Sequence, residues 1–521
     1  MVRCLSENTS SGIFVSESLS SGQPIPVRRD TVAAFLGPAP RGPVGIPVTI
    51  GGIDEYLQRF GVSGHDGPLL EVICQFFANG GKNATVVRVC SSARRHHIVF
   101  PGPSGALTLE AINPGPYELL RASIDYDGIL PTDLDRFNLV IHRLTSRVRP
   151  IIERQEVYHG LSVDITDPDF IGHALLGSEL VSIKEEIPEQ RPDITFCDDI
   201  EIGTSYIYVD PEWAETDHLT DYDLIGCNTE GTGLFALDQI PSVDIVSLVT
   251  DEQDPGPVAL FAAERYCRKQ NAILLVDPPT HWQSVGSAIR LARKSDFMSP
   301  NVVSYFPRPI NSKQQPASVI GALAGTLVSS DARAGVWGMH EDAQLQMRGR
   351  VQLPFDLNVE EQQALKRVGI NSLRITNPSH LELSGLVTLN RGYGCAAEWD
   401  KLSQRRTALF ILDNIARSTQ WAAFQENNSE TWSELRDQVR YFLYELFAEG
   451  ALFGANAADA GYVICNQQTN SDSTPVGESG ISFVVGFMPR GQGMHSFRFH
   501  QLPVECRIQT LHIEDLVALA S

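Results

Sequence analysis

The stretch "FFANGGKNATVVRV", from Phe76 to Val89, decides how the first part of the chain is interpreted. Its centre, Gly80-Gly81-Lys82, could be a phosphate-binding loop or the joint between a helix and a strand. A phosphate loop places its glycines after a strand and before a helix, so that backbone N–H groups face the anion. Here the order is reversed, because apolar residues at helical spacing come before the glycines and β-branched residues come after them. The pattern therefore predicts that Asn79 and Gly80 end a helix.

Composition sets the class of protein. The chain has 521 residues, which is enough for two to four domains, and 42% of them are hydrophobic. It carries 41 basic and 63 acidic residues, for a net charge of −22. This balance argues against direct nucleic-acid binding, which depends on Lys and Arg neutralising phosphates, and it suits a basic protein partner.

The cysteines and the start of the chain indicate the cellular compartment in which the protein is assembled. The nine cysteines are scattered and odd in number, without the spacing of a zinc site, so we expect reduced and largely buried thiols. The start "MVRCLSENTSSG" has no apolar core of a secretory signal, and the longest apolar stretch, "ASVIGALAGTLV", is too short to span a bilayer. These features predict assembly in a cytosol and no membrane insertion.

The clearest fold signal lies between residues 240 and 330. Short apolar strands such as "SVDIVSLVT" and "AILLVD" alternate with amphipathic helices such as "GPVALFAAERYCRKQN", which predicts an α/β domain with a parallel sheet. Such sheets bind ligands beyond the carboxyl ends of their strands. Asp251, Asp277 and His281 fall there, so an α/β enzyme using these three residues is an alternative interpretation. The plainer one is that strand-end aspartates cap the following helices.

Other catalytic patterns are weaker. "GTSY" at 203–206 resembles a protease nucleophile turn, but Ser205 is followed by a strand-like run and lacks companion His and Asp motifs. We predict no enzymatic activity and no cofactor or metal.

The remaining regions have different characters. Residues 96–165 read as strands separated by turns, whereas 185–240 has no assignable periodicity. Two long helices are expected near 403–424 and 429–454, the second with an apolar stripe and with Ser429 as a possible cap. Strands follow to the C-terminus. The strand-like segments 12–18 and 504–513 have no obvious hairpin partner nearby, so each is predicted to pair with another chain.

Four stretches together resemble the sheath proteins of contractile phage tails and related injection machines. They are "GIFVSES" with "RRDTVAAFLGPAPRGPVGIPVTIGGIDEYLQRFG", then "LEVICQFFANGGKNATVVRV", then "LEAINPG" with "YHGLSVD", and finally "RRTALFILDNIARSTQWAAFQENNSETWSELRDQVRYFLYELFAEGALFG". They span most of residues 10–515. Two parts depart from the family pattern: "GYGCAAEWDKLS" precedes the Arg-Arg pair, and 185–240 matches nothing in it.

The resemblance implies a domain plan. It comprises an N-terminal linking arm (1–22), an outer α/β domain often called subtilisin-like (23–95 and 166–380), a β-rich inserted domain (96–165), an inner α+β domain (381–503) and a C-terminal linking arm (504–521). The inner domain would be built from both chain ends.

The resemblance also implies function and partners. A helical stack of hexameric rings would surround a tail tube and contract to drive that tube through the target envelope. Expected partners are further copies of the chain, the tube protein, and baseplate and tail terminator proteins. The protein would be located in the tail of the virion, and it would be assembled in the host cytoplasm.

Two sets of residues are candidates for these contacts. The linking strands would use Ile13, Phe14, Val15 and Ser16 at one end, and Cys506, Ile508, Thr510 and Leu511 at the other. The tube-facing candidates are the acidic residues Glu430, Glu434, Asp437 and Glu445, which would meet a basic tube surface; the alternative is that they form an ordinary solvated face of the helix.

Overall fold

The computed structural model describes most of the chain. The described residues are 24–27, 30–61, 67–91, 95–115, 118–145, 151–195, 207–208, 219–250, 254–295, 297–311, 314–338, 344–346, 351–377, 380–390, 399–471, 480–512 and 515. The chain divides into two compact units, which we call the terminal unit (1–28 and 407–521) and the central unit (29–406). Each is described separately.

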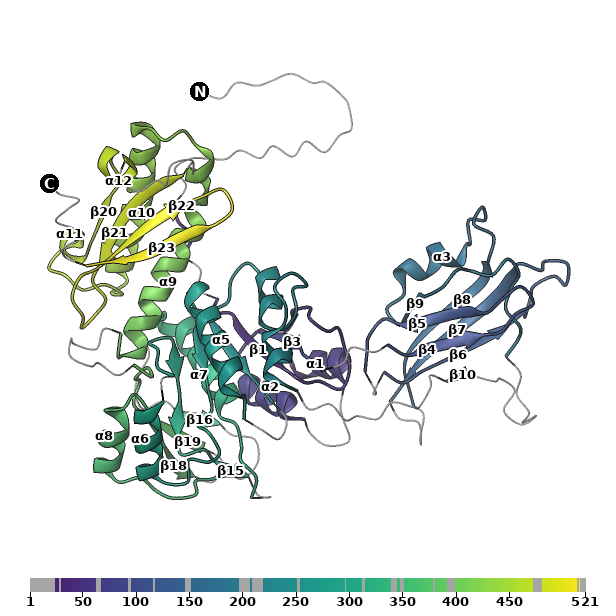
Figure 1. Ribbon diagram of the computed structural model, residues 1–521, viewed down its shortest axis with the longest axis horizontal. Coiled ribbons are helices and arrows are strands. Elements are labelled where there is room, and N and C mark those ends of the chain that lie inside the picture. Colours follow the sequence, from purple (N-terminus) through teal and green to yellow (C-terminus); the bar gives the residue numbers. More distant parts are fainter. Residues whose placement is uncertain are drawn as a thin grey trace. The chain divides into compact units, whose positions relative to one another are not determined.

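A six-stranded sheet forms the middle of the central unit (Figure 1). Its strand order is β13-β12-β11-β1-β3-β2. The bounds are β1 Ala33–Gly37, β2 Val48–Ile50, β3 Ala84–Arg88, β11 Ile245–Leu248, β12 Ile273–Leu275 and β13 Val302–Val303. All neighbouring pairs are parallel except β2 with β3. The predicted parallel sheet is therefore confirmed, and it takes strands from both the first and the middle part of the chain.

The helix–strand joint predicted from the Asn-Gly-Gly stretch is confirmed. Helix α2 (Pro68–Ala78) ends at Asn79, and Gly80 has φ of 91°, which is strained for residues with a Cβ. The two glycines also allow close packing: a Cβ on Gly80 would lie 2.8 Å from Ser329 Oγ, and one on Gly81 would lie 2.2 Å from the Phe76 ring. The joint is thus part of the packed scaffold.

Helices cover the sheet of the central unit. They are α1 (Ile53–Phe60), α2, α4 (Asp221–Ile225), α5 (Pro257–Lys269) and α7 (Ile320–Ala334), whereas α6 (Val285–Lys294) shares a separate core with Phe306 and Leu365. Helix α7 packs closely on α2, because a Cβ on Gly321 would lie 2.0 Å from Val72 O and one on Gly325 would lie 2.2 Å from Phe76 O. Small residues therefore bring these two helix backbones together.

Two further sheets of the central unit pack around a core of their own. One has the order β4-β5-β9 and the other β10-β6-β7-β8. Their bounds are β4 His97–Phe100, β5 Leu107–Ala111, β6 Leu120–Asp125, β7 Arg136–Leu144, β8 Ile152–Ser162, β9 Val181–Ile183 and β10 Ile207–Tyr208, with α3 Ile171–Ala174 and the 3₁₀ turn η1 Leu175–Gly177. Phe100, Leu109, Phe137 and Ile141 are buried in the shared core. Two strands come from beyond residue 165, and β10 lies in the region that showed no periodicity.

The rest of the central unit is a small α/β cluster. Strands β14 (Tyr305–Phe306), β18 (Asn371–Asn377), β19 (His380–Ser384) and β16 (Gln344–Gln346) form a sheet in that order, and β15 (Ile310–Asn311) pairs with β17 (Val351–Gln352). Helix α8 (Val359–Lys366) lies beside β18, and its residue Leu365 shares a core with Phe306 and Ile370. Between β10 and β11 the chain also forms the 3₁₀ turn η2 (Gly233–Gln239).

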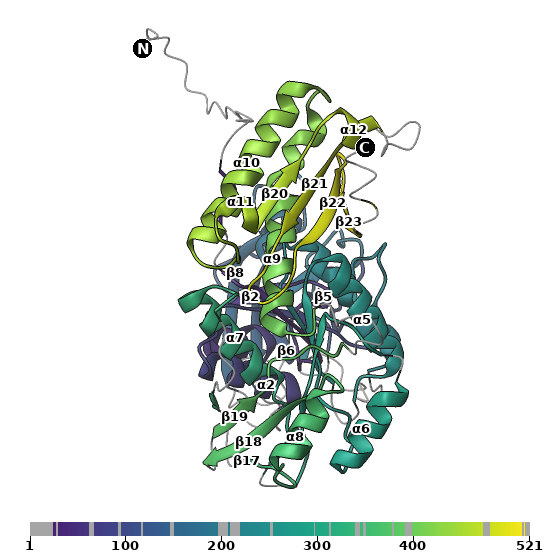
Figure 2. The same ribbon diagram turned by 90° about the vertical axis from the view of Figure 1, so that its left-hand side faces the viewer.

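The terminal unit is a four-stranded antiparallel sheet with helices on it (Figure 2). Its strand order is β20-β21-β22-β23. The bounds are α9 Leu402–Ser418, η3 Gln420–Phe424, α10 Ser429–Ala448, α11 Ala457–Ala460, β20 Gly461–Ile464, α12 Gln467–Ser471, β21 Ile481–Phe487, β22 His495–Gln501 and β23 Cys506–Leu511. Helix α9 begins in the central unit and continues into the terminal one.

Two sequence predictions about this region are wrong. Asn428, and not Ser429, is the N-cap of α10, since its Oδ1 accepts from the amides of Glu430 and Thr431. The segment 504–513 also has a hairpin partner, because β23 pairs with β22 in a six-residue register. Strand β22 was not predicted, although its alternation of Ser, Arg and His with Phe is typical of a strand, because a glycine-rich turn precedes it.

Candidate assembly surfaces and the pocket at the sheet edge

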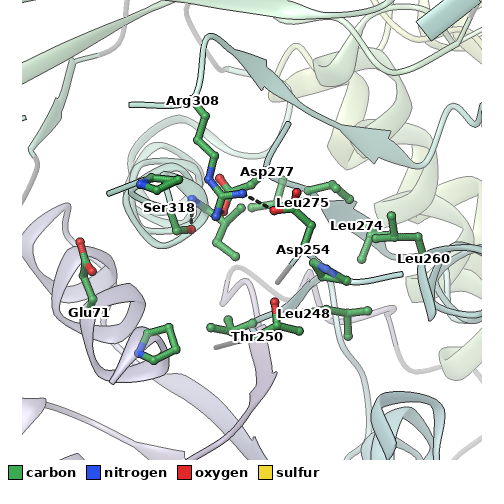
Figure 3. Close-up of a pocket in the computed structure, with 16 residues that line it drawn as sticks. Glu71, Leu248, Thr250, Asp254, Leu260, Leu274, Leu275, Asp277, Arg308 and Ser318 are labelled. Carbon is green, nitrogen blue, oxygen red and sulfur yellow. Dashed lines mark hydrogen bonds and ion pairs between the residues drawn. The ribbon is translucent and has the colours of Figure 1, made fainter. Parts of the chain in front are cut away.

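A pocket of about 80 Å³ lies at the carboxyl edge of the parallel sheet, as the topology predicts. Thr250, Asp254, Asp277 and Arg308 line it together with residues at the start of α2 and α7. Figure 3 shows the Arg308 guanidinium between the two aspartates, with its bond to Asp254. The Nη1–Oδ1 distance to Asp254 is 2.5 Å and the Nη2–Oδ2 distance to Asp277 is 3.9 Å.

The carboxylates of this pocket hold the scaffold. Asp277 Oδ1 accepts from Val319 N at 3.1 Å, just before the start of α7. Asp254 Oδ2 accepts from the amide and the hydroxyl of Thr280 at 2.7 and 2.9 Å. Burial raises the pKa of Asp254, but these hydrogen bonds and the charge of Arg308 outweigh it and lower the pKa overall. Both carboxylates therefore bind neighbouring protein atoms, but neither caps the helix that follows it in the chain, since the N-caps of α5 and α6 are Gly256 and Ser284.

Two residues of the enzyme interpretation, Asp277 and His281, are described, and only Asp277 lines the pocket. His281 is exposed and is not among the residues that line the pocket. Asp251 and Ser205 lie outside the described residues. Within the described part of the chain, no three His, Cys, Asp or Glu side chains gather as a metal site requires.

Helix α10 has one face in the core of the terminal unit and one face outward. Leu435, Val439, Phe442, Leu443 and Leu446 are buried, as the apolar stripe predicts. Of the acidic candidates, Glu430 and Asp437 are exposed, whereas Glu434 and Glu445 are half-buried on the flank. The outward face is thus acidic at its N-terminal end.

Two tyrosines on this face were missed by the sequence analysis. Tyr441 and Tyr444 are 50% and 56% exposed and lie three residues apart, on the same side of the helix as Asp437. A hydrogen bond to Glu445 raises the pKa of Tyr441. Their spacing outside the apolar stripe was the signal that could have identified them. The C-terminal half of the outward face is therefore aromatic.

Strand β23 ends the sheet of the terminal unit. Among the described strands it pairs only with β22, so it is an edge strand of this sheet within the described part of the chain. The candidate residues Cys506, Ile508, Thr510 and Leu511 all lie in this strand; Leu511 is buried and Thr510 is exposed. The matching candidates Ile13, Phe14, Val15 and Ser16 lie outside the described residues.

Searches by sequence found no family model that matches the chain and no curated protein similar to it. Among the helices that the structure describes, none is long and apolar enough to cross a membrane.

Comparison with solved structures identifies proteins whose fold resembles that of this chain. Solved structures that resemble the chain over nearly its whole length are sheath proteins of tails and contractile injection systems. The chain has the mixed α/β, multi-sheet fold of the contractile tail sheath family, which confirms the resemblance found in its sequence.

Three of these structures are particularly informative. A sheath tail protein from Listeria innocua is 12% identical, with a TM-score of 0.59 over 92% of this chain and 94% of its own. A sheath tail protein from Desulfitobacterium hafniense is 11% identical, with a TM-score of 0.56 over 96% and 100%. The helical sheath of the anti-feeding prophage, in its contracted state, is 13% identical, with a TM-score of 0.52 over 92% and 96%.

Proposed function

We propose that this chain is a structural sheath protein. It polymerises as a helical stack of hexameric rings around a tail tube, and the stack contracts to drive the tube through the envelope of a target cell. The observation that carries the proposal is the likeness in fold over more than nine-tenths of the chain to sheath structures, one of them a helical sheath. On this proposal the outer, subtilisin-like part is a scaffold without catalytic activity.

The position of β23 at the end of the described sheet supports a mechanism for linking copies. The arm at residues 1–22 adds a strand to the terminal sheet of a neighbouring copy, next to β23. Main-chain hydrogen bonds of this kind persist while rigid units rotate, so arms can act as hinges between extended and contracted packings. Because each copy donates an arm to the next, the contact is head-to-tail and builds a helical polymer.

Deletion of residues 1–20 tests the linking arm. We expect a folded, soluble protein with an unchanged circular dichroism spectrum that no longer forms long polymers by sedimentation and electron microscopy. A matched chain with residues 1–20 replaced by a Gly/Ser segment of equal length controls for mass and charge. Polymers of normal length from the truncated protein would rule out strand exchange by this arm.

The outward face of α10 is proposed to meet a basic tube. Exposed ion pairs contribute only about 0–1 kcal/mol each, so several can keep register without locking the tube in place. The double variant Glu434→Lys with Asp437→Lys should reduce co-assembly with purified tubes, most strongly at low salt. The control is Asp356→Lys with Glu360→Lys, which makes the same charge change in the central unit, where both residues are exposed. Equal co-assembly of the two variants would place the tube contact elsewhere.

We further infer that the ends of the polymer contact baseplate and tail terminator proteins. The chain would be made and assembled in the host cytoplasm and would remain in the particle, without direct contact with nucleic acid. These partners follow from the sheath role and are tested by co-purification with assembled tails.

A further inference from the structure

The chain passes between its two units twice, after residue 28 and after residue 406. A single carboxylate in the central unit, that of Asp331 near the end of α7, holds a residue close to each crossing. Thr31 lies three residues beyond the first crossing, and Arg406 is the last residue before the second. These partners are 300 and 75 positions away from Asp331 along the sequence.

The Asp331 carboxylate is completely engaged. Its Oδ1 accepts from Arg406 Nη1 at 2.9 Å, and its Oδ2 accepts from Arg406 Nη2 and from Thr31 Oγ1, the latter at 2.6 Å. The side chains of Asp331 and Arg406 are only 2% and 4% exposed. A buried, two-pronged pair of this kind is strongly disrupted when one partner is removed, because the other charge is left without compensation.

Adjacent bonds reinforce both segments. Arg405 Nε and Nη2 donate to Asn301 Oδ1 at 3.0 and 2.7 Å, and Asn301 in turn donates to Ala272 O. Burial lowers the pKa of Arg405 to about 10, which leaves it charged at neutral pH. On the other segment, Val32 N donates to Asp244 Oδ2 at 2.7 Å. Each crossing therefore has a tie of its own in addition to the shared one.

The support behind Asp331 is rigid. Helix α7 is buried along most of its length, and Gly321 and Gly325 bring its backbone against α2. A carboxylate on such a helix has little freedom to follow a displaced partner.

We propose that Asp331 is a clamp that fixes both connections between the units to one point of the central unit. Because Thr31 and Arg406 both depend on this one carboxylate, loss of the carboxylate frees both segments, and the two connections then open together. Force that reaches the terminal unit then passes into α7 and the sheet behind it, and the first turn of α9 stays wound. The clamp does not depend on the proposed sheath role, since it is a property of the isolated chain.

Hydrogen–deuterium exchange of the full chain tests the clamp. The variants are Asp331→Asn, which removes the charge, and Thr31→Val, which removes only the first connection. Asp331→Asn should speed exchange about tenfold or more in both 30–33 and 402–410, because exchange reports local opening. Thr31→Val should speed it a few-fold in 30–33 alone. Strand β12 (Ile273–Leu275) reports whether the sheet remains folded.

Three outcomes would overturn the proposal. They are unchanged exchange in Asp331→Asn, faster exchange in only one of its two segments, and equal loss of protection in β12, which would make Asp331 an ordinary core residue. A third variant, Asp331→Leu with Arg406→Met, replaces the buried ion pair with apolar side chains and is expected to fold. The clamp predicts that 30–33 stays loosened in it, since Thr31 has no acceptor; wild-type protection there would contradict the clamp.

Discussion

The parallel sheet of the central unit and the antiparallel sheet of the terminal unit differ in how their faces and edges are covered. Every residue of β1, β3 and β11 is buried, and the edge strands β2 and β13 have only three and two residues. In the terminal unit, the edge strand β23 has six residues, and several of them are exposed. Short edges discourage pairing with other chains, whereas a long edge permits it. This difference agrees with the proposed function, in which the central sheet is a scaffold and the terminal sheet is a site for assembly.

The largest difference is expected for side-chain truncation. Phe35 on β1 is completely buried, and its ring meets that of Phe76 edge-to-face at 5.3 Å. Phe35→Ala should lower the unfolding free energy of the central unit by about 3–5 kcal/mol. Thr510→Ala on β23 should change that of the terminal unit by no more than about 0.5 kcal/mol. Denaturant unfolding measures both, with each unit fitted as its own transition. Similar losses would mean that the two sheets do not differ as described.

A second test compares two glycines. A Cβ at Gly81 would lie 2.2 Å from the Phe76 ring, whereas a Cβ at Gly493, between β21 and β22, would meet nothing within 4 Å. Gly81→Ala should therefore destabilise the central unit by about 1–3 kcal/mol through overpacking. Gly493→Ala should stay within about 0.5 kcal/mol of the wild type. The melting temperatures of the two variants provide the readout. A melting temperature of Gly81→Ala equal to that of the wild type would show that the helix–strand joint is not part of the packed scaffold.

The third test compares the reactivity of two cysteine thiols, one in each unit, and involves no expected change in stability. Cys227 in the central unit is exposed, and its hydrogen bond with Thr229 lowers its pKa; burial raises the pKa of Cys506 on β23 to about 12. Because the thiolate is the nucleophile, Cys227 should react with iodoacetamide faster than Cys506 at pH 8. The rate at Cys506 should rise about tenfold per pH unit from pH 8 to 10, while that at Cys227 levels off.

Peptide mass spectrometry after timed labelling measures both rates. Thr229→Val is the matched control and should slow the reaction at Cys227 only. Faster labelling of Cys506 than of Cys227 at pH 8 would show that the Cys506 thiol is less buried than described.

The sequence predicted those parts of the fold that depend on neighbouring residues. The Asn79-Gly80 helix end and the strand after it follow from local conformational preference, and the parallel strands follow from their apolar runs. Strand β22 was missed although Ser496, Arg498 and His500 alternate with two phenylalanines as in a strand, because its glycine-rich context favours a turn. The outward tyrosines of α10 were not predicted, because acidic residues are the stronger sequence signal for a solvent-exposed helix face.

Contacts between residues far apart in the chain could not be predicted from the sequence. Nothing in the order of residues places Thr31 and Arg406 on one carboxylate, since that requires α7 to be packed first on α2. The pocket is an intermediate case: its place at the sheet edge follows from topology, but its pairing of Arg308 with Asp254 does not.

Electron microscopy of the purified full chain tests the sheath role most directly. The account predicts long, cross-striated, hollow cylinders built from stacked rings, which form without nucleotide, metal or substrate. It also predicts that purified tubes of the same particle enter these cylinders. Discrete particles that never polymerise across salt and protein concentration, from a chain that is folded by circular dichroism, would contradict the proposed function.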